Sequence, residues 1–148
     1  MLAILLAVRY GQTSGLPHGP LPLASLTSLD GDALALGAHE HGYVVHFFAT
    51  WCGVCRAEEG SVSSLARDHE VIVIATQSGG EQALREYAAG VGLDPGQIAL
   101  DPDGAIAQRF GVHAFPTTFY VGSDGAIRTA EVGYTTQIGM RLRAWWVE

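Results

Sequence analysis

Apolar residues fall into runs and periodic stretches that predict strands and helices in succession. Two continuous apolar runs, residues 43–49 and 71–76, are rich in β-branched and aromatic side chains and predict buried strands. After each run, apolar residues recur at helical spacing, which predicts helices over about 52–69 and 81–89. Strands that alternate with helices in this way indicate an α/β fold.

The second half of the chain continues the alternation and closes on a hairpin. A loop at 92–96 and a short apolar run at 98–100 precede a turn at 101–104. The predicted elements that follow are a short helix over 105–110, strands over 117–121 and 126–132 joined at Ser123-Asp124-Gly125, and a final helix over about 135–147. The closing hairpin adds antiparallel strands, so the sheet is expected to be mixed.

The N-terminal part divides into three segments. Residues 1–9 are apolar up to Arg9, but they are far shorter than the roughly 20 residues that cross a bilayer, so we interpret them as the tail of a membrane anchor or signal segment. A short apolar strand or an unstructured start is the alternative. Residues 10–22 are rich in Gly and Pro and predict an extended linker. Residues 23–148 form the domain, which begins with a β-hairpin around Asp30-Gly31.

Composition narrows the class of protein. A length of 148 residues with 48% hydrophobic and 16% charged residues suits one globular domain. The net charge of -7 argues against nucleic acid as a partner. Two cysteines cannot form a disulfide framework, so their number does not fix the compartment.

Those two cysteines, Cys52 and Cys55, form a CxxC motif where a strand pattern gives way to a helix pattern. Unpaired N–H groups and the helix dipole at a helix start favour a thiolate, which makes Cys52 the expected nucleophile. Cys55, one turn later, is the expected resolving thiol. A zinc site and an inert structural disulfide are the alternatives, although no second CxxC or His-x3-His pair completes a zinc site.

The run from Val44 to Cys55, together with Phe115-Pro116-Thr117 before a later strand, resembles the thioredoxin superfamily. Within it, the N-terminal hairpin, the segment before the turn at 101–104 and the segment 132–136 are most similar to membrane-anchored TlpA/DsbE-like disulfide oxidoreductases, and closest to ScsD-type proteins. The resemblance implies an α/β thioredoxin fold, a mixed central sheet flanked by helices, with an added N-terminal β-hairpin.

The resemblance also implies a substrate-binding rim. Trp51 matches the aromatic residue that precedes the nucleophile and shields one side of the site. Phe115-Pro116 is expected to be a cis peptide that faces the CxxC, where the backbone of Phe115 can pair with an extended substrate segment. The alternative for Pro116 is an ordinary proline at the start of a strand.

Two further residues are candidates for proton transfer. Glu58 matches a glutamate that TlpA-like reductases carry one turn after the CxxC, and it could accept the proton of Cys55; a solvated first-turn glutamate is the alternative. His46 stands where thioredoxins have a buried aspartate. If it points beneath the CxxC, a neutral imidazole could relay protons and an imidazolium could stabilise a thiolate; a core histidine is the alternative.

We therefore predict a periplasmic, monomeric protein-disulfide oxidoreductase, tethered through its N-terminus to the bacterial inner membrane. It would reduce protein disulfides through Cys52 and Cys55, receive electrons from a membrane donor, and need no dissociable cofactor and no metal. Three alternatives stay open: a cytochrome c maturation reductase of the DsbE type, a Cu(I)-binding module that uses the CxxC, and a cytoplasmic thioredoxin.

Overall fold

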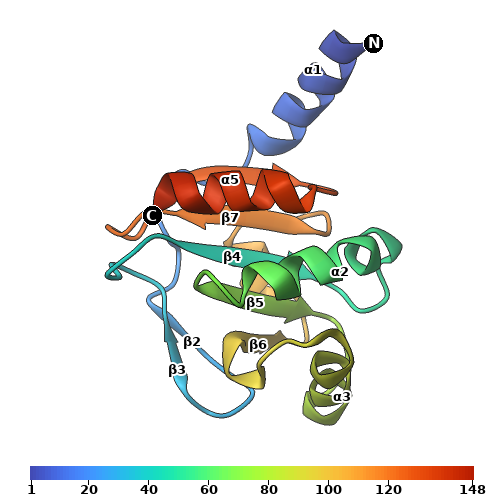
Figure 1. The fold of residues 1–148 in the computed structure, drawn as a ribbon, viewed down its shortest axis with the longest axis vertical. Coiled ribbons are helices and arrows are strands. Elements are labelled where there is room, and N and C mark those ends of the chain that lie inside the picture. The colour runs from blue at the N-terminus through green and yellow to red at the C-terminus, as the bar shows by residue number, and fades with distance from the viewer.

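The computed structural model describes all of residues 1–148 and contains helices on both faces of a central sheet (Figure 1). In the N-terminal half the elements are α1 (Leu2–Thr13), β1 (Gly19–Pro20), β2 (Ser25–Thr27), β3 (Ala33–Ala35), β4 (Tyr43–Phe48), α2 (Gly53–Leu65) and β5 (Val71–Thr76). They are followed by α3 (Glu81–Val91), the 3-10 turn η1 (Pro95–Gln97), β6 (Ile98–Asp101), α4 (Ala105–Arg109), β7 (Thr117–Val121), β8 (Ala126–Val132) and α5 (Gln137–Val147).

The central sheet is mixed, as predicted. Its six strands lie in the order β1-β8-β7-β4-β5-β6, with β4 parallel to β5 and β5 parallel to β6. The strands β7 and β8 pair antiparallel with their neighbours. The strand β4 lies in the middle of the sheet and is fully buried. The CxxC follows its carboxyl end, so it lies where the central parallel strands end.

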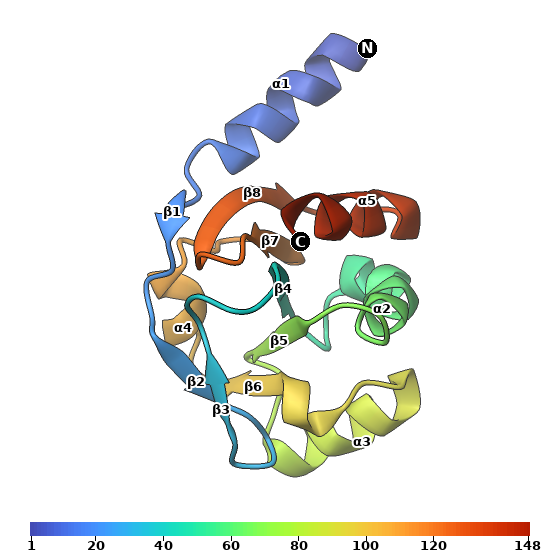
Figure 2. The same cartoon turned by 60° about the vertical axis from the view of Figure 1, so that its left-hand side comes forward.

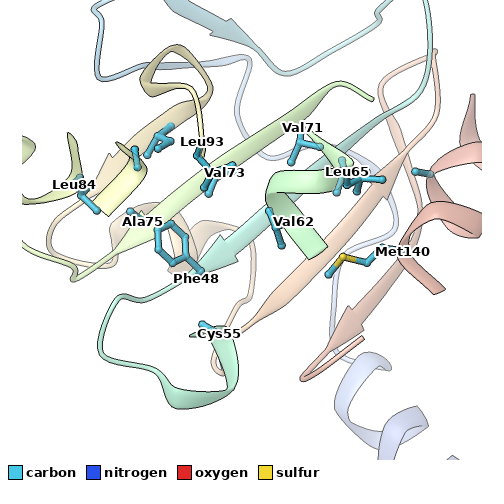
Figure 3. Close-up of a cluster of buried hydrophobic side chains, with 14 of the residues drawn as sticks. Phe48, Cys55, Val62, Leu65, Val71, Val73, Ala75, Leu84, Leu93 and Met140 are labelled. Carbon is cyan, nitrogen blue, oxygen red and sulfur yellow. The ribbon is translucent and has the colours of Figure 1, made fainter. Parts of the chain in front are cut away.

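Alternating side chains of the central strands divide the core into two clusters. Val44 and Phe48 face α2, α3 and α5, whereas Val45 and Phe47 face the opposite layer. That second layer consists of α4 and the β2–β3 hairpin, and Figure 2 shows it on the side of the sheet away from the three longer helices. Figure 3 shows Cys55 at the edge of the first cluster.

The hairpin predicted ahead of the core is confirmed, with Leu26 opposite Leu34. Gly31 adopts φ +87° in its turn, a conformation that glycine reaches without strain. The helix predicted over 52–69 ends at Leu65 instead. The following residues form turns in which Ala66 and His69 both donate backbone hydrogen bonds to the end of α2.

The predicted linker over 10–22 is wrong in two places. The helix α1 continues to Thr13, since no proline precedes Pro17 to interrupt it. Leu16 then enters the second core cluster, and Gly19–Pro20 pairs with β8 as an edge strand. Residues 2–9 belong to the helix α1 and do not form the alternative strand.

The helix α1 projects from the body of the protein, and none of its residues is buried (Figure 1). No helix in the structure combines the length and the apolar character that a membrane crossing requires.

Candidate active site

The two cysteines lie at the start of α2, both as free thiols. Cys52 is the N-cap residue, with extended backbone angles (φ -86°, ψ 116°), and its Sγ accepts a hydrogen bond from the backbone N–H of Cys55 at 3.2 Å. The same thiol lies 3.6 Å from the carbonyl oxygen of Phe115, to which it donates. Cys52 is partly exposed and Cys55 is buried, so only the first sulfur is open to a large substrate.

Burial controls the protonation of Cys55. Desolvation raises the pKa of the Cys55 thiol to about 12, with further contributions from its contact with Cys52 and the charge of Glu58. Cys55 is therefore a neutral thiol in the resting dithiol. It needs a nearby base before it can attack a disulfide.

Glu58 lies on the same buried face of α2, one turn beyond Cys55. Its Oε1 accepts the backbone N–H of Thr135 at 2.6 Å, whereas its Oε2 has no hydrogen-bond partner. Desolvation raises the pKa of Glu58 to about 7; the Thr135 N–H opposes this shift and the charge of Glu131 adds to it. Because both protonation states are accessible near neutral pH, Glu58 can accept and return a proton. The interpretation of Glu58 as a solvated glutamate is wrong, since its side chain is fully buried.

His46 points toward the CxxC side of the sheet. It lines a small cavity of about 10 Å³ together with Cys55, Phe48 and Tyr87, and its Nδ1 shares a 2.9 Å hydrogen bond with Thr118 Oγ1. Burial lowers the pKa of His46 to about 4. At neutral pH the His46 ring is therefore uncharged and cannot stabilise a thiolate as an imidazolium. Proton transfer by the neutral ring is the role that stays open.

We expect the His46 ring to show no titration between about pH 5.5 and 8, because its folded-state pKa lies well below that range. Nitrogen-15 NMR of the imidazole rings measures this directly, with His46→Ala identifying the signal. A midpoint near 6.5 would contradict the prediction. If His46→Ala also leaves the pH dependence of Cys52 alkylation unchanged, His46 is a structural residue and not a proton relay.

Aromatic residues form an apolar rim around Cys52. The ring of Trp51 is 60% exposed and meets the ring of Phe115 edge-on, with centroids 6.0 Å apart. The Phe115–Pro116 peptide bond is cis and precedes β7. The structure thus places Trp51 and Phe115 beside Cys52, and Pro116 directly follows Phe115 in the chain.

Sequence reasoning missed the residues that hold this rim from other segments. The Trp51 Nε1 donates to the carbonyl of Gln77 at 3.1 Å, and the Thr50 N–H donates to Ser78 Oγ at 2.9 Å. The loop after β5 could have been predicted here, because the carboxyl ends of adjacent parallel strands meet at one edge of a sheet. No local signal indicated that Thr135 would bind Glu58.

Comparison with known proteins gives the family of this chain. The family model described as Redoxin matches residues 17–141, most of the chain. The chain belongs to the Redoxin family. It is 33% identical over 100 residues to the thiol:disulfide interchange protein CycY of Rhizobium leguminosarum bv. viciae; the match covers 66% of this chain and 53% of that protein, so the chain spans about half the length of this relative. It is 30% identical over 125 residues to the thiol:disulfide interchange protein DsbE of Pseudomonas fluorescens biotype C, covering 82% and 70% of the two chains.

Comparison with a solved structure shows the fold. A secreted disulfide oxidoreductase of Mycobacterium tuberculosis, described as homologous to Escherichia coli DsbE, superposes with a TM-score of 0.68 at 24% identity, covering 82% of this chain and 94% of that one. This Redoxin family chain therefore has a thioredoxin fold. Its particular closeness to ScsD-type proteins stays a prediction.

Proposed function

We propose that this protein reduces disulfide bonds of other proteins through a Cys52–Cys55 dithiol cycle, outside the cytoplasm. One observation carries the proposal: a partly exposed sulfur at a helix start adjoins a buried thiol, and a buried carboxyl with a pKa of about 7 lies one turn further on. These are the nucleophile, the resolving group and the proton acceptor that disulfide exchange requires.

The cycle begins when the Cys52 thiolate attacks one sulfur of a substrate disulfide. A mixed disulfide forms, the substrate S–S bond breaks, and the second substrate sulfur leaves as a thiolate that takes a proton from solvent. The apolar rim of Trp51 and Phe115 contacts the substrate segment, and the carbonyl oxygen of Phe115 lies 3.6 Å from the attacking sulfur of Cys52.

The second step uses Cys55 and Glu58. The Glu58 carboxylate accepts the proton of the Cys55 thiol, and the Cys55 thiolate attacks the Cys52 sulfur. The mixed disulfide breaks, and the substrate sulfur leaves as a thiolate that takes a proton from solvent. The substrate is then fully reduced, and a Cys52–Cys55 disulfide remains. Two electrons have passed to the substrate, so an external dithiol donor must restore the pair, and we assign this role to a membrane electron donor.

The location and tether belong to the same proposal. A DsbE-like protein of known structure is secreted, which supports a site of action outside the cytoplasm. The exposed apolar helix α1 supports a tether to the inner membrane through the N-terminus. We expect the domain to act as a monomer, because its rim suits brief contact with a partner.

The similarity to DsbE and CycY favours one narrower candidate, a thiol reductase for cytochrome c maturation. An assay with oxidised apocytochrome peptides beside an unrelated disulfide substrate separates the two functions. Reduction of both substrates supports the broader function. Reduction of the apocytochrome peptide alone supports the narrower one.

The redox equilibrium of Cys52–Cys55 against glutathione tests the direction of electron flow. A reductant should lie toward the potential of thioredoxin, about -270 mV, and an oxidant toward that of DsbA, about -120 mV. A value at the DsbA end would overturn the reductive direction while leaving the cysteine roles intact. Failure to form the Cys52–Cys55 disulfide at all would overturn the function itself.

A further inference from the structure

A second buried carboxyl group, Glu131 on β8, is connected to the active-site carboxyl group of Glu58. Glu131 is 8% exposed. Thr135 bridges the two side chains: its backbone N–H donates to Glu58 Oε1 at 2.6 Å, and its hydroxyl donates to Glu131 Oε2 at 2.8 Å. Glu58 on α2 and Glu131 on β8 thus bind two different groups of one residue, the backbone N–H and the hydroxyl of Thr135.

Two arginines bind the other oxygen of Glu131. The Arg143 guanidinium on α5 lies 2.8 Å from Glu131 Oε1, and that of Arg9 on α1 lies 3.6 Å from the same atom. Arg143 is also held by the carbonyl of Gly139 at 2.9 Å, and Arg9 by the carbonyl of Tyr134 at 3.0 Å. These contacts are ion pairs of a carboxylate, so Glu131 carries a negative charge next to Glu58.

We propose that Glu131 is a positioning residue whose negative charge holds the proton on Glu58, and that the positive charge of Arg143 opposes this effect. The balance of these two charges sets the pH at which Glu58 can activate Cys55. This inference rests on the function proposed above. A carboxylate disfavours ionisation of a second carboxyl group close by, and a cation favours it.

The titratable and charged groups around Glu58 come from five elements. Cys55 on α2 faces Glu58 as a neutral thiol. On β7, the Tyr120 hydroxyl has no hydrogen-bond partner, and burial followed by the charge of Glu131 raises its pKa, so it too is neutral. The charged groups are Glu131 on β8, Arg143 on α5 and Arg9 on α1. The charge of Glu131 is one of the causes that raise the pKa of Glu58.

Carbon-13 NMR of the glutamate side-chain carboxyl groups tests the proposal, with Glu58→Gln identifying the Glu58 signal. Glu131→Gln keeps an oxygen acceptor for the Thr135 hydroxyl but removes the negative charge, and we expect it to lower the Glu58 midpoint by about one pH unit. Arg143→Gln removes the opposing charge and should raise that midpoint by about half a unit. The matched control is Glu40→Gln in an exposed loop, which should leave the midpoint unchanged.

Opposite shifts distinguish an electrostatic role from a structural one, because loosened packing would move both variants in one direction. Unmoved midpoints, or shifts of the same sign, would overturn the proposal. If Glu131→Gln does not fold, Arg143→Gln decides alone: a midpoint that does not rise overturns it. The acid limb of disulfide reduction against pH should follow the same shifts. A wild-type protein that exchanges no disulfide refutes the proposed function, whereas the NMR midpoints judge the charge cluster independently.

Discussion

Replacing Cys55 with serine is expected to stop the cycle after its first chemical step. Cys52 keeps its place at the start of α2 and can attack a disulfide, but serine cannot displace the substrate. The mixed disulfide should therefore accumulate to nearly one per protein, while turnover falls by about 10³-fold or more. Non-reducing electrophoresis and intact-mass spectrometry with a disulfide-bonded substrate measure both effects.

Cys52→Ser is the matched control for this experiment. It retains the buried Cys55, whose raised pKa keeps it a thiol, so neither a mixed disulfide nor turnover should appear. A stable adduct on Cys55 in this variant would contradict the assigned order of attack. Equal trapping by both variants would show that the burial of Cys55 does not select the nucleophile.

Glu58→Gln is expected to stabilise the reduced protein at alkaline pH. The folded-state pKa of Glu58 is raised from 4.5 to about 7, so the contribution of this group is fully present below pH 4.5 and is lost as the pH rises through 7. The loss amounts to about 3 kcal/mol. Glutamine stays neutral and offers the same oxygen to the Thr135 N–H, so the variant should exceed the wild type by about this amount above pH 8 and match it near pH 4.

Urea unfolding of both proteins at several pH values, under reducing conditions, measures this difference in the free energy of unfolding. The comparison must be between variants, because His46 acts with the opposite sign. Because the pKa of His46 is lowered, the protein loses stability as the pH falls from 6.5 through about 4. A pH series on the wild type without the variant would therefore not reveal the Glu58 effect. A difference between Glu58→Gln and wild type that stays constant with pH would refute the buried, proton-binding Glu58.

The core elements could be predicted because their signals are local. The buried strands 43–48 and 71–76 and the hairpin around Asp30-Gly31 lie where apolar runs and turn residues placed them. The prediction of a linker over residues 10–22 was wrong because Gly and Pro residues indicate where a helix or strand is interrupted. They do not indicate which elements lie before and after the interruption. Leu16 and the strand β1 are ordered by contacts with the body of the fold, which no local pattern encodes.

The reactive groups could be recognised from the amino-acid sequence, because each depends on neighbours within a few residues: a CxxC at a strand-to-helix junction, a glutamate one helical turn later, and the succession of strands and helices. The protonation of the site could not be recognised in this way, because it depends on the folded structure. Whether Glu58 and His46 are buried, and on which side of the sheet, depends on segments far away in the chain; Thr135 lies 77 residues from Glu58, and Thr118 lies 72 residues from His46. The proton affinity of each group is set by the desolvation and the charges that these distant contacts impose, and they exist only once the chain has folded.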